Sequence, residues 1–320
     1  MGIQSPNSKH PPLPLLRDTE VVEAQPDQRS LIFRYTEECT KIIRADKGRP
    51  FLLYLAHMHV HLPHYVAERF AAESTNGRYG AAVAAIDWST GVILAELRRQ
   101  GLDANTLVIF TSDNGSRCDF GPSNGLLHGT KNSPWEGGLR VPFLARWPGR
   151  VPAGRFCDTI LTGMDLLPTF AALAGVAPQR ERPIDGVDAS ALLLGETPAA
   201  PLHETLPIYQ GSNLDAVRRD RWKLYLARHG RDGVAGPVLE LYDLVGDPGE
   251  DRNVAAEHPD VVAQLERDAE GFRQKFGDAA LMREGAERRP IGRVDHPRTL
   301  TRFDPAHPYY QAMYDINEAG

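Results

Sequence analysis

Two neighbouring polar residues, Asp113 and Asn114, directly follow an apolar stretch and have side chains that can bind a cation. The preceding residues 107–110 read Leu-Val-Ile-Phe, which predicts a buried strand. In open α/β sheets, ligands bind beyond the carboxyl ends of the strands. A carboxylate and an amide oxygen at that place are the hard ligands that Ca²⁺ or Mg²⁺ takes. An Asp-Asn-Gly turn without a ligand is the alternative that these residues alone leave open.

A second candidate group is a histidine cluster after the apolar residues 51–56, which read Phe-Leu-Leu-Tyr-Leu-Ala. Its members are His57, His59, His61 and His64. In extended backbone the first three share one face, because side chains alternate along a strand. They could bind zinc, one of them could act as an acid, a base or a donor to an anion, or they could simply close the strand. Zinc hydrolases with an H-x-H-x-D-H pattern need an Asp that this cluster lacks.

A third candidate is Lys131, in the loop Gly129-Thr-Lys-Asn-Ser133, which precedes the glycine pair Gly137-Gly138. A lone loop lysine is usually solvated. A lysine that converges with an Asp-Asn pair and histidines at one sheet edge instead fits an oxyanion-binding pocket.

The elements between these residues predict how the residues come together. Residues 79–100 have the apolar spacing of a long helix, which ends at Gly101. A strand at 51–56, this helix and a strand at 107–110 form a βαβ unit, so we expect the two strands to be parallel. The residues after Ala56 and after Phe110 would then lie at the same edge of the sheet.

Other segments complete an α/β pattern. Residues 1–28 are rich in proline and predict an extended loop, and residues 36–44 predict a short helix. A strand at 141–147 and a helix at 165–175 follow. After a linker at 196–205, a small antiparallel sheet with one packed helix is expected, with strands at 206–210, 216–227 and 238–243 and the helix at 258–275.

Composition excludes several classes of protein. The 320 residues carry 36 basic and 42 acidic side chains, a net charge of −6, without a long Lys/Arg run, which argues against a nucleic-acid partner. No apolar run approaches the roughly 20 residues of a membrane-spanning helix. The three cysteines, Cys39, Cys118 and Cys157, are widely spaced and predict neither a disulfide framework nor a zinc ribbon.

Several motifs, in order, resemble those of type I sulfatases of the arylsulfatase group, in the alkaline-phosphatase-like superfamily. They are Pro50-Phe-Leu-Leu-Tyr-Leu-Ala-His with His61, Asp87-Trp-Ser-Thr-Gly, the 105–115 segment with Ser-Asp-Asn-Gly, Gly129-Thr-Lys with Trp135-Glu-Gly-Gly-Leu-Arg-Val-Pro, Met164-Asp-Leu-Leu-Pro, Asp185-Gly-Val-Asp and Leu241-Tyr-Asp-Leu-Val-Gly-Asp-Pro-Gly-Glu250. The similarity runs from about residue 11 to about residue 255.

The resemblance implies a fold, a reaction and roles for single residues. Residues 1–198 would be the C-terminal part of the catalytic domain, a partial sheet sandwiched by helices, with a small α+β subdomain at 199–276 and an extended tail at 277–320. The reaction would be hydrolysis of a small-molecule or glycan sulfate ester. Asp113 and Asn114 would be ligands of Ca²⁺, Lys131 would contact the sulfate, and His61 would donate to the leaving group.

The chain departs from the family at the nucleophile. These sulfatases oxidise the first residue of a Cys/Ser-x-Pro-x-Arg motif to formylglycine, and no cysteine or serine here begins such a motif. The family's early Asp-Asp pair, which supplies further metal ligands, also has no counterpart. Ca²⁺ takes about six to eight oxygen ligands, so we expect an incomplete site and an isolated chain that is not an efficient sulfatase.

The alternatives are a non-catalytic binding remnant and a phosphate or phosphonate ester hydrolase of the same superfamily. The family is commonly exported, periplasmic or lysosomal, but the chain has no signal peptide, so its location and its oligomeric state stay open.

Overall fold

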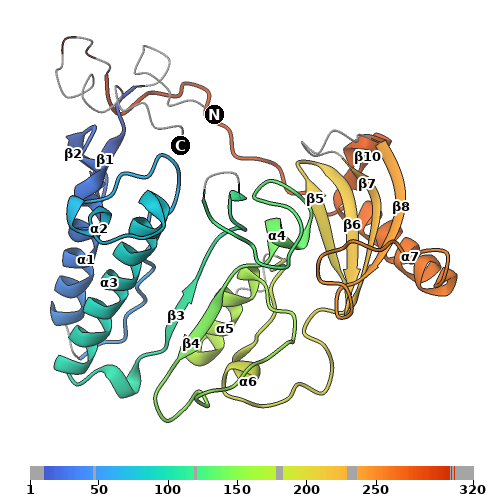
Figure 1. Ribbon diagram of the computed structural model, residues 1–320, viewed down its shortest axis with the longest axis horizontal. Helices are drawn as coiled ribbons and strands as arrows, with labels where there is room; N and C mark the ends of the chain where they lie inside the picture. The colour runs from blue at the N-terminus through green and yellow to red at the C-terminus, as the bar shows by residue number, and fades with distance from the viewer. Residues whose placement is uncertain are drawn as a thin grey trace. The chain divides into compact units, whose positions relative to one another are not determined.

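The computed structural model describes residues 11–45, 48–118, 121–177, 183–228, 236–302, 304 and 306. The chain forms two compact units (Figure 1), each described here by itself. The first contains described residues up to 103, together with residue 121 and the described residues from 292 onward. The second contains those of 104–118 and 122–291. The expected α/β class is confirmed, as a mixture of helices and small antiparallel sheets.

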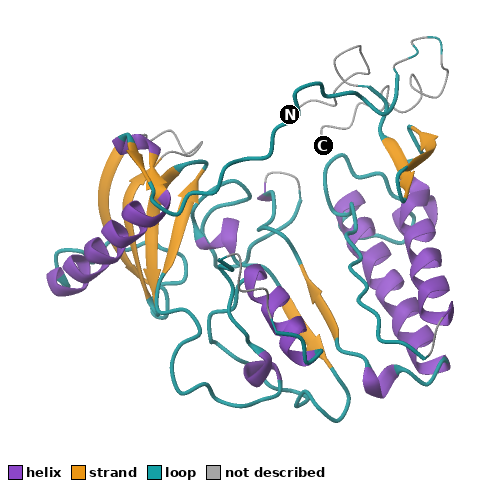
Figure 2. Cartoon of the chain, turned by 180° about the vertical axis from the view of Figure 1, so that it is seen from behind, coloured by secondary structure: helices purple, strands orange, loops and turns teal. Residues whose placement is uncertain are grey.

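The first unit begins with a hairpin and contains two long helices that pack together. Strands β1 (Pro14–Arg17) and β2 (Glu20–Ala24) pair antiparallel, and α1 (Gln28–Ala45), α2 (Glu68–Ala71) and α3 (Gly77–Arg99) follow. Figure 2 shows α1 and α3 side by side. The helices expected at 36–44 and 79–100 are therefore confirmed, although α1 begins earlier than its apolar spacing indicated.

Two buried hydroxyl groups connect α1 to α3. The buried hydroxyls of Thr36 and Ser89 lie 2.6 Å apart. Ala81 and Ala82 of α3 are buried in a separate cluster with Val66 and Phe70.

Two expectations for the first unit are wrong. Residues 51–56 form no strand, and Leu52 and Tyr54 are 74% and 86% exposed. A strand needs a partner for its backbone ladder, and strand β3 (Val108–Thr111) pairs instead with a later strand of its own unit. The expected parallel βαβ pair is therefore not formed. The hairpin β1–β2 was also missed, because proline-rich, largely exposed strands lack the alternation that signals a sheet.

Among the described residues, α3 alone is long and apolar enough to cross a membrane by length and composition. A core helix of a soluble protein passes the same test, so this is weak evidence.

The second unit opens with a two-stranded ladder. Strand β3 (Val108–Thr111) pairs antiparallel with β4 (Phe143–Arg146), with Val108 opposite Arg146 and Thr111 opposite Phe143. Both strands were expected from the sequence. The short helix α4 (Glu136–Leu139) precedes β4, and α5 (Leu166–Leu173) and α6 (Ser190–Leu193) follow it.

A four-stranded antiparallel sheet forms the rest of this unit. Its strands are β5 (Leu206–Gln210), β6 (Asn213–Arg219), β7 (Trp222–Arg228) and β8 (Gly236–Asp243), in that order. Helix α7 (Pro259–Phe276) packs on it, as expected, and the short strands β9 (Gly277–Asp278) and β10 (Arg283–Glu284) pair beyond the helix. The apolar run 216–227 is two strands rather than one, because the chain turns at Asp220, which has a φ of 50°.

Both faces of this sheet are covered. Leu214, Leu224 and Leu241 pack against α7, in a cluster with Leu265. On the other face, Ala216, Tyr225 and Tyr242 pack against Trp135, which precedes α4. A sheet covered on both faces explains why consecutive residues are buried at 214–217 and at 223–225 in its central strands.

A buried aspartate joins two of the segments quoted for the family resemblance. Asp165 is fully buried and accepts hydrogen bonds from the backbone N–H groups of Thr162, at 2.7 Å, and Val187, at 2.8 Å. His203 Nε2 lies 2.9 Å from both of its carboxylate oxygens. Burial would raise the pKa of Asp165, but these hydrogen bonds hold it below its usual value.

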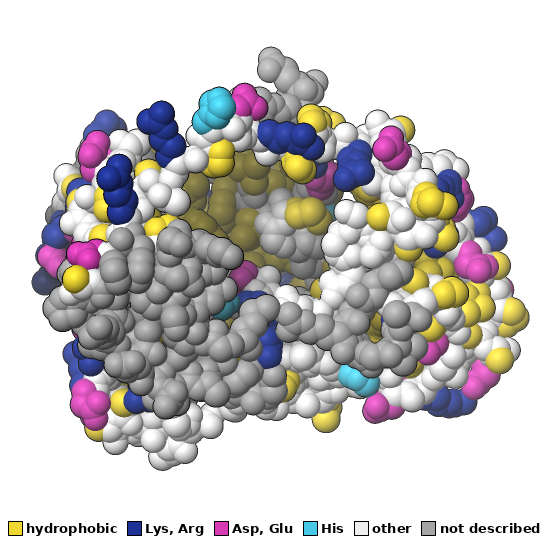
Figure 3. All heavy atoms as spheres, turned by 90° about the horizontal axis from the view of Figure 1, so that it is seen from above, with side chains coloured by type: hydrophobic (Ala, Val, Ile, Leu, Met, Phe, Trp, Pro, Cys, Tyr) yellow, Lys and Arg dark blue, Asp and Glu magenta, His cyan; other side chains and the backbone are white. Residues whose placement is uncertain are grey.

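Charges of both signs are interspersed on the face drawn in Figure 3, where lysines, arginines and acidic side chains alternate with apolar ones.

Candidate active site

The Asp-Asn pair follows the end of β3 and is open to solvent. Asp113 is exposed and Asn114 is half-buried. The nearest polar contact of the Asp113 carboxylate is the Ser112 hydroxyl, at 3.5 Å. Both side-chain oxygens are thus available for a cation. Within the part of the chain that the structure describes, no three His, Cys, Asp or Glu side chains gather into a group that could hold a metal ion.

A close backbone approach fixes the end of this strand. The Gly115 N–H donates to the Gly138 carbonyl at 3.0 Å. A Cβ built on Gly115 would lie 1.9 Å from the Gly137 carbonyl oxygen, so any larger residue would push the segments apart. The glycine pair is itself enclosed by carbonyl oxygens of residues 127–133. These glycines allow three chain segments to pack without side chains between them.

The loop that carries Lys131 is hydrogen-bonded to the same strand end. The Lys131 N–H donates to the Ser116 carbonyl at 2.9 Å, and the Thr130 hydroxyl donates to the same oxygen at 2.5 Å. Asn124 connects the two segments from the other side: its Oδ1 accepts from the Ser116 hydroxyl at 2.5 Å and its amide donates to the Gly129 carbonyl at 2.9 Å. The structure therefore brings the Lys131 loop to the Asp113–Asn114 strand end.

The Lys131 side chain is half-buried and forms no ion pair with any residue that the structure describes. The next residue, Asn132, has a φ of 69°, so the chain turns sharply after Lys131. The backbone of Lys131 is thus held against the segment that carries Asp113 and Asn114.

The histidine cluster lies in the first unit. His61 is exposed, and its Nδ1 lies 2.6 Å from the Leu62 carbonyl oxygen. Because a carbonyl only accepts, Nδ1 carries the proton of this hydrogen bond. His61 Nε2 takes no part in this hydrogen bond.

His57 and His59 have a different environment. Burial lowers the pKa of His57, and burial together with the charges of His57 and His64 lowers the pKa of His59 to about 4. The Nδ1 of His57 and the Nε2 of His59 are buried without a hydrogen-bond partner in the described structure. These two rings are neutral at pH 7, and the cluster with His61 is not gathered around a metal position.

Sequence reasoning missed a buried charge cluster formed by Glu136, Lys223, Glu250 and Tyr225. Lys223 Nζ lies 2.9 Å from a Glu136 oxygen and 3.0 Å from a Glu250 oxygen, and it donates to the Pro134 carbonyl at 2.7 Å. Tyr225 donates to Glu250 at 2.9 Å, and Glu250 accepts the Glu136 N–H at 2.8 Å. The cluster joins β7 to the segment just after the Lys131 loop. The one signal of this cluster in the sequence was Lys223, which lies inside the otherwise apolar run 222–227.

The electrostatics of the cluster favour its ionised form. Burial would raise the pKa of Glu136, but Lys223 and then Arg218 hold it below its usual value. Arg218 donates to the second Glu136 oxygen at 2.9 Å. Burial and the Glu250 carboxylate raise the pKa of Tyr225, so this phenol stays protonated and donates.

The chain is also similar to known proteins. Residues 15–176 match a family model described as Sulfatase, and residues 130–275 match one described as N-sulphoglucosamine sulphohydrolase, C-terminal. The chain is 35% identical over 301 residues to steryl-sulfatase of Mus musculus, covering 83% of this chain and 48% of the relative. It is 35% identical over 287 residues to arylsulfatase A of Bos taurus, covering 80% and 56%.

Solved structures are also similar to this chain. A sulfatase from Pseudoalteromonas sp. matches with a TM-score of 0.70 at 25% identity, covering 76% of this chain and 52% of that one. A protein named Ps i-CgsB, in complex with k-i-k-neocarrahexaose, matches with a TM-score of 0.68 at 29% identity, covering 81% and 58%. The chain spans about half, or less, of the length of the steryl-sulfatases that it matches, 48% for the mouse protein and 36% for the rat protein.

Proposed function

Because this chain belongs to the sulfatase family, we propose that its residues supply the cation-binding and sulfate-contacting part of a sulfate-ester hydrolase. The observation that carries the proposal is the 2.9 Å hydrogen bond from the Lys131 N–H to the Ser116 carbonyl, two residues after Asn114. It holds a lysine without an ion-pair partner in the described structure close to two oxygen donors. That combination matches the charges of a sulfate group bound beside a divalent cation.

Asp113 and Asn114 would hold the cation, with Ca²⁺ as the proposed ion. The donor set fits in kind, because both residues offer hard oxygens and, among the described residues, the Asp113 carboxylate has a hydroxyl neighbour at 3.5 Å. Two residues are fewer than the ligands that Ca²⁺ takes, so we propose that the remaining ligands lie outside this pair. When bound, the ion would supply positive charge against the sulfate oxygens.

Lys131 would neutralise and orient the sulfate group with its ammonium. His61 would donate a proton to the oxygen of the leaving alcohol. Since its Nδ1 already donates to the Leu62 carbonyl, donation from Nε2 requires the imidazolium form of the ring. After proton transfer, the neutral ring keeps its Nδ1 hydrogen bond and its orientation.

The nucleophile is the missing component. No Cys/Ser-x-Pro-x-Arg motif, the source of the family's formylglycine, occurs in the 320 residues. We therefore propose that these 320 residues alone do not turn over a sulfate ester efficiently, because positioning groups without a nucleophile lose most of the rate.

The substrate would be a sulfate ester of a small molecule or a glycan. Among the relatives are proteins named steryl-sulfatase and N-acetylgalactosamine-6-sulfatase, and one structural neighbour carries a neocarrahexaose. A shared core with different substrates means that specificity resides in loops around it.

The intact mass of the native protein, purified from its source cells, is the first test. We expect a mass above 35.4 kDa, additional peptides with an oxidised Cys or Ser, and hydrolysis of 4-nitrophenyl sulfate. The 320-residue chain made alone should not hydrolyse this ester but should bind Ca²⁺ weakly by calorimetry. A native protein of 35.4 kDa without sulfatase activity would support the binding remnant instead. Hydrolysis of 4-nitrophenyl phosphate but not the sulfate would support a phosphatase.

A further inference from the structure

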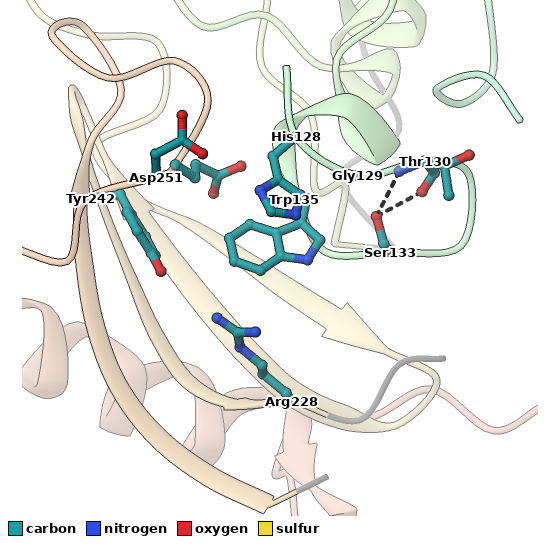
Figure 4. A pocket seen from close by; sticks show the side chains of 9 residues that line it. His128, Gly129, Thr130, Ser133, Trp135, Arg228, Tyr242 and Asp251 are labelled. Atoms are coloured by element: carbon teal, nitrogen blue, oxygen red, sulfur yellow. Dashed lines mark hydrogen bonds between the residues drawn. The ribbon is translucent and has the colours of Figure 1, made fainter. Parts of the chain in front are cut away.

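A cavity of about 400 Å³ lies within the second unit, between the start of the Lys131 loop and the four-stranded sheet. Figure 4 shows its walls. The loop contributes His128, Gly129, Thr130, Ser133 and Trp135, and the sheet side contributes Arg228, Tyr242, Glu250 and Asp251. Its volume is within the range of small-ligand sites.

Stacked flat groups make the centre of the cavity rigid. The His128 ring stacks on the Trp135 indole with centroids 4.2 Å apart, and the Arg228 guanidinium lies 4.6 Å from the same indole. Figure 4 shows His128 and Arg228 on opposite sides of the indole. Trp135 is itself buried, whereas His128 is exposed.

Three polar side chains of the cavity keep hydrogen-bonding capacity for a ligand. The Arg228 Nε is buried without a partner in the described structure, although its Nη2 is bonded to Glu240. No described residue forms a hydrogen bond or ion pair with the His128 ring or the Asp251 carboxylate. By contrast, Thr130 and Ser133 bond to each other, and Glu250 is satisfied inside the charge cluster.

We propose that this cavity binds a saccharide ring, and thus that the sulfate ester is carried by a glycan rather than by a sterol. A sugar offers hydroxyls that donate to Asp251 and accept from Arg228 Nε, and an apolar C–H face that packs on a flat ring such as His128. An apolar sterol ring offers no acceptor to the buried Arg228 Nε, whose N–H would stay unpaired, which is unfavourable.

The position of the cavity connects the sugar to the sulfate group. Gly129 and Thr130 line it and directly precede Lys131. Successive Cα atoms are about 3.8 Å apart, so the backbone of Lys131 lies one residue beyond the cavity wall. The assignment of the sulfate rests on the proposed function, but saccharide binding by the cavity does not.

Saturation-transfer NMR on the full 320-residue chain tests the proposal. The probes are galactose, N-acetylglucosamine, the 6-sulfates of both sugars, and dehydroepiandrosterone sulfate. We expect signals from at least one sugar and its 6-sulfate. Asp251→Asn and His128→Ala, both at exposed positions, should each weaken this binding about tenfold. Glu266→Gln, an equal charge change at an exposed position of α7, should leave it unchanged.

Lys131→Ala separates the two proposals. It should weaken binding of the 6-sulfate but not of the unsulfated sugar. Sugar binding that responds to Asp251→Asn, with no effect of Lys131→Ala on the 6-sulfate, would support the cavity and contradict the role of Lys131. Absence of binding by all four sugars, or sugar binding indifferent to both cavity variants, would overturn the saccharide site, as would preferred binding of the steroid sulfate.

Discussion

Lys223 and Glu136 form an ion pair with 2.9 Å between Nζ and Oε1, and their side chains are 0% and 2% exposed. The pair connects the centre of the four-stranded sheet to the glycine-rich segment that follows Lys131. Because a buried charge is tolerated only with partners, the sheet and this segment depend on each other. The C-terminal sheet is therefore part of what holds the candidate site in place.

Replacing Lys223 with Met should lower the free energy of unfolding by about 3–5 kcal/mol, because Glu250 would remain buried without its cation and Glu136 would keep Arg218 but lose its buried cation. Urea unfolding followed by circular dichroism measures this loss. The matched control is Lys275→Met, whose partner Glu287 is 3.6 Å away and about half exposed. The control should cost under about 1 kcal/mol. Equal losses in both variants would show that the buried cluster has no special role.

The pH dependence of the free energy of unfolding should reveal the titration of His59. Its pKa in the folded state is about 4, below the value of 6.5 for a free imidazole. Between these two values the unfolded chain binds a proton that the folded chain does not. The free energy of unfolding should therefore fall as the pH falls from about 6.5 to about 4.

Urea unfolding at a series of pH values tests this expectation. His59→Gln removes the titrating group and should flatten this part of the curve. His61→Gln, at an exposed position, should leave the slope as it is. If His59→Gln keeps the full slope, burial of His59 is not its cause.

The sequence predicted elements whose evidence is local. Strand β5 was expected at 206–210 and is observed there, and α3 was expected within a few residues of its bounds. Periodicity identifies such elements because each is defined by the side chains of its own neighbours. The run 51–56 has a strand's composition but forms none, since pairing depends on a distant partner.

In the candidate site, too, local motifs predict single residues but not their distant partners. Asp113, Asn114 and the Lys131 loop were proposed from short motifs, and the structure brings them together through Ser116 and Gly115. The ion pair of Lys223 with Glu136 joins residues 87 positions apart. No local sequence pattern predicts which acidic residue forms an ion pair with such a lysine. The pair of Lys223 with Glu136 could therefore not be derived from spacing in the sequence.

Lys131→Ala in the native, full-length protein should reduce kcat for 4-nitrophenyl sulfate about 10²–10³-fold, the loss typical of removing one charge-stabilising donor. Lys131→Arg should recover part of the rate, because it keeps the charge with a different shape. Lys41→Ala, an exposed lysine of α1 paired with Glu37 and Glu38, serves as the control and should retain the full rate. A fully active Lys131→Ala protein would exclude this lysine as a sulfate contact.

Asp113→Asn should weaken Ca²⁺ binding at least about tenfold, because it removes the one charged ligand of the proposed pair. Isothermal titration calorimetry measures the affinity, and treatment of the native protein with EGTA should lower its activity in parallel. Asp158→Asn changes the same charge at an exposed position of the same unit. Equal calcium affinity of the two variants would place the metal elsewhere.

Gly115→Ala should destabilise the protein by about 1–3 kcal/mol, because overpacked backbone must shift to admit the methyl group. The added Cβ would lie 1.9 Å from the Gly137 carbonyl oxygen and 2.8 Å from the Gly138 Cα. Gly271→Ala in α7 is the matched control, since nothing lies within 4 Å of its Cβ position. That change should stabilise the helix by about 0.5–1 kcal/mol.

Urea unfolding of both variants gives the two opposite signs, and calcium titration of Gly115→Ala reports whether the displaced backbone also disturbs Asp113. A Gly115→Ala protein as stable as the unmodified chain would mean that the strand end can move away from the glycine pair without cost. The close packing would then not be what positions the Asp113–Asn114 pair.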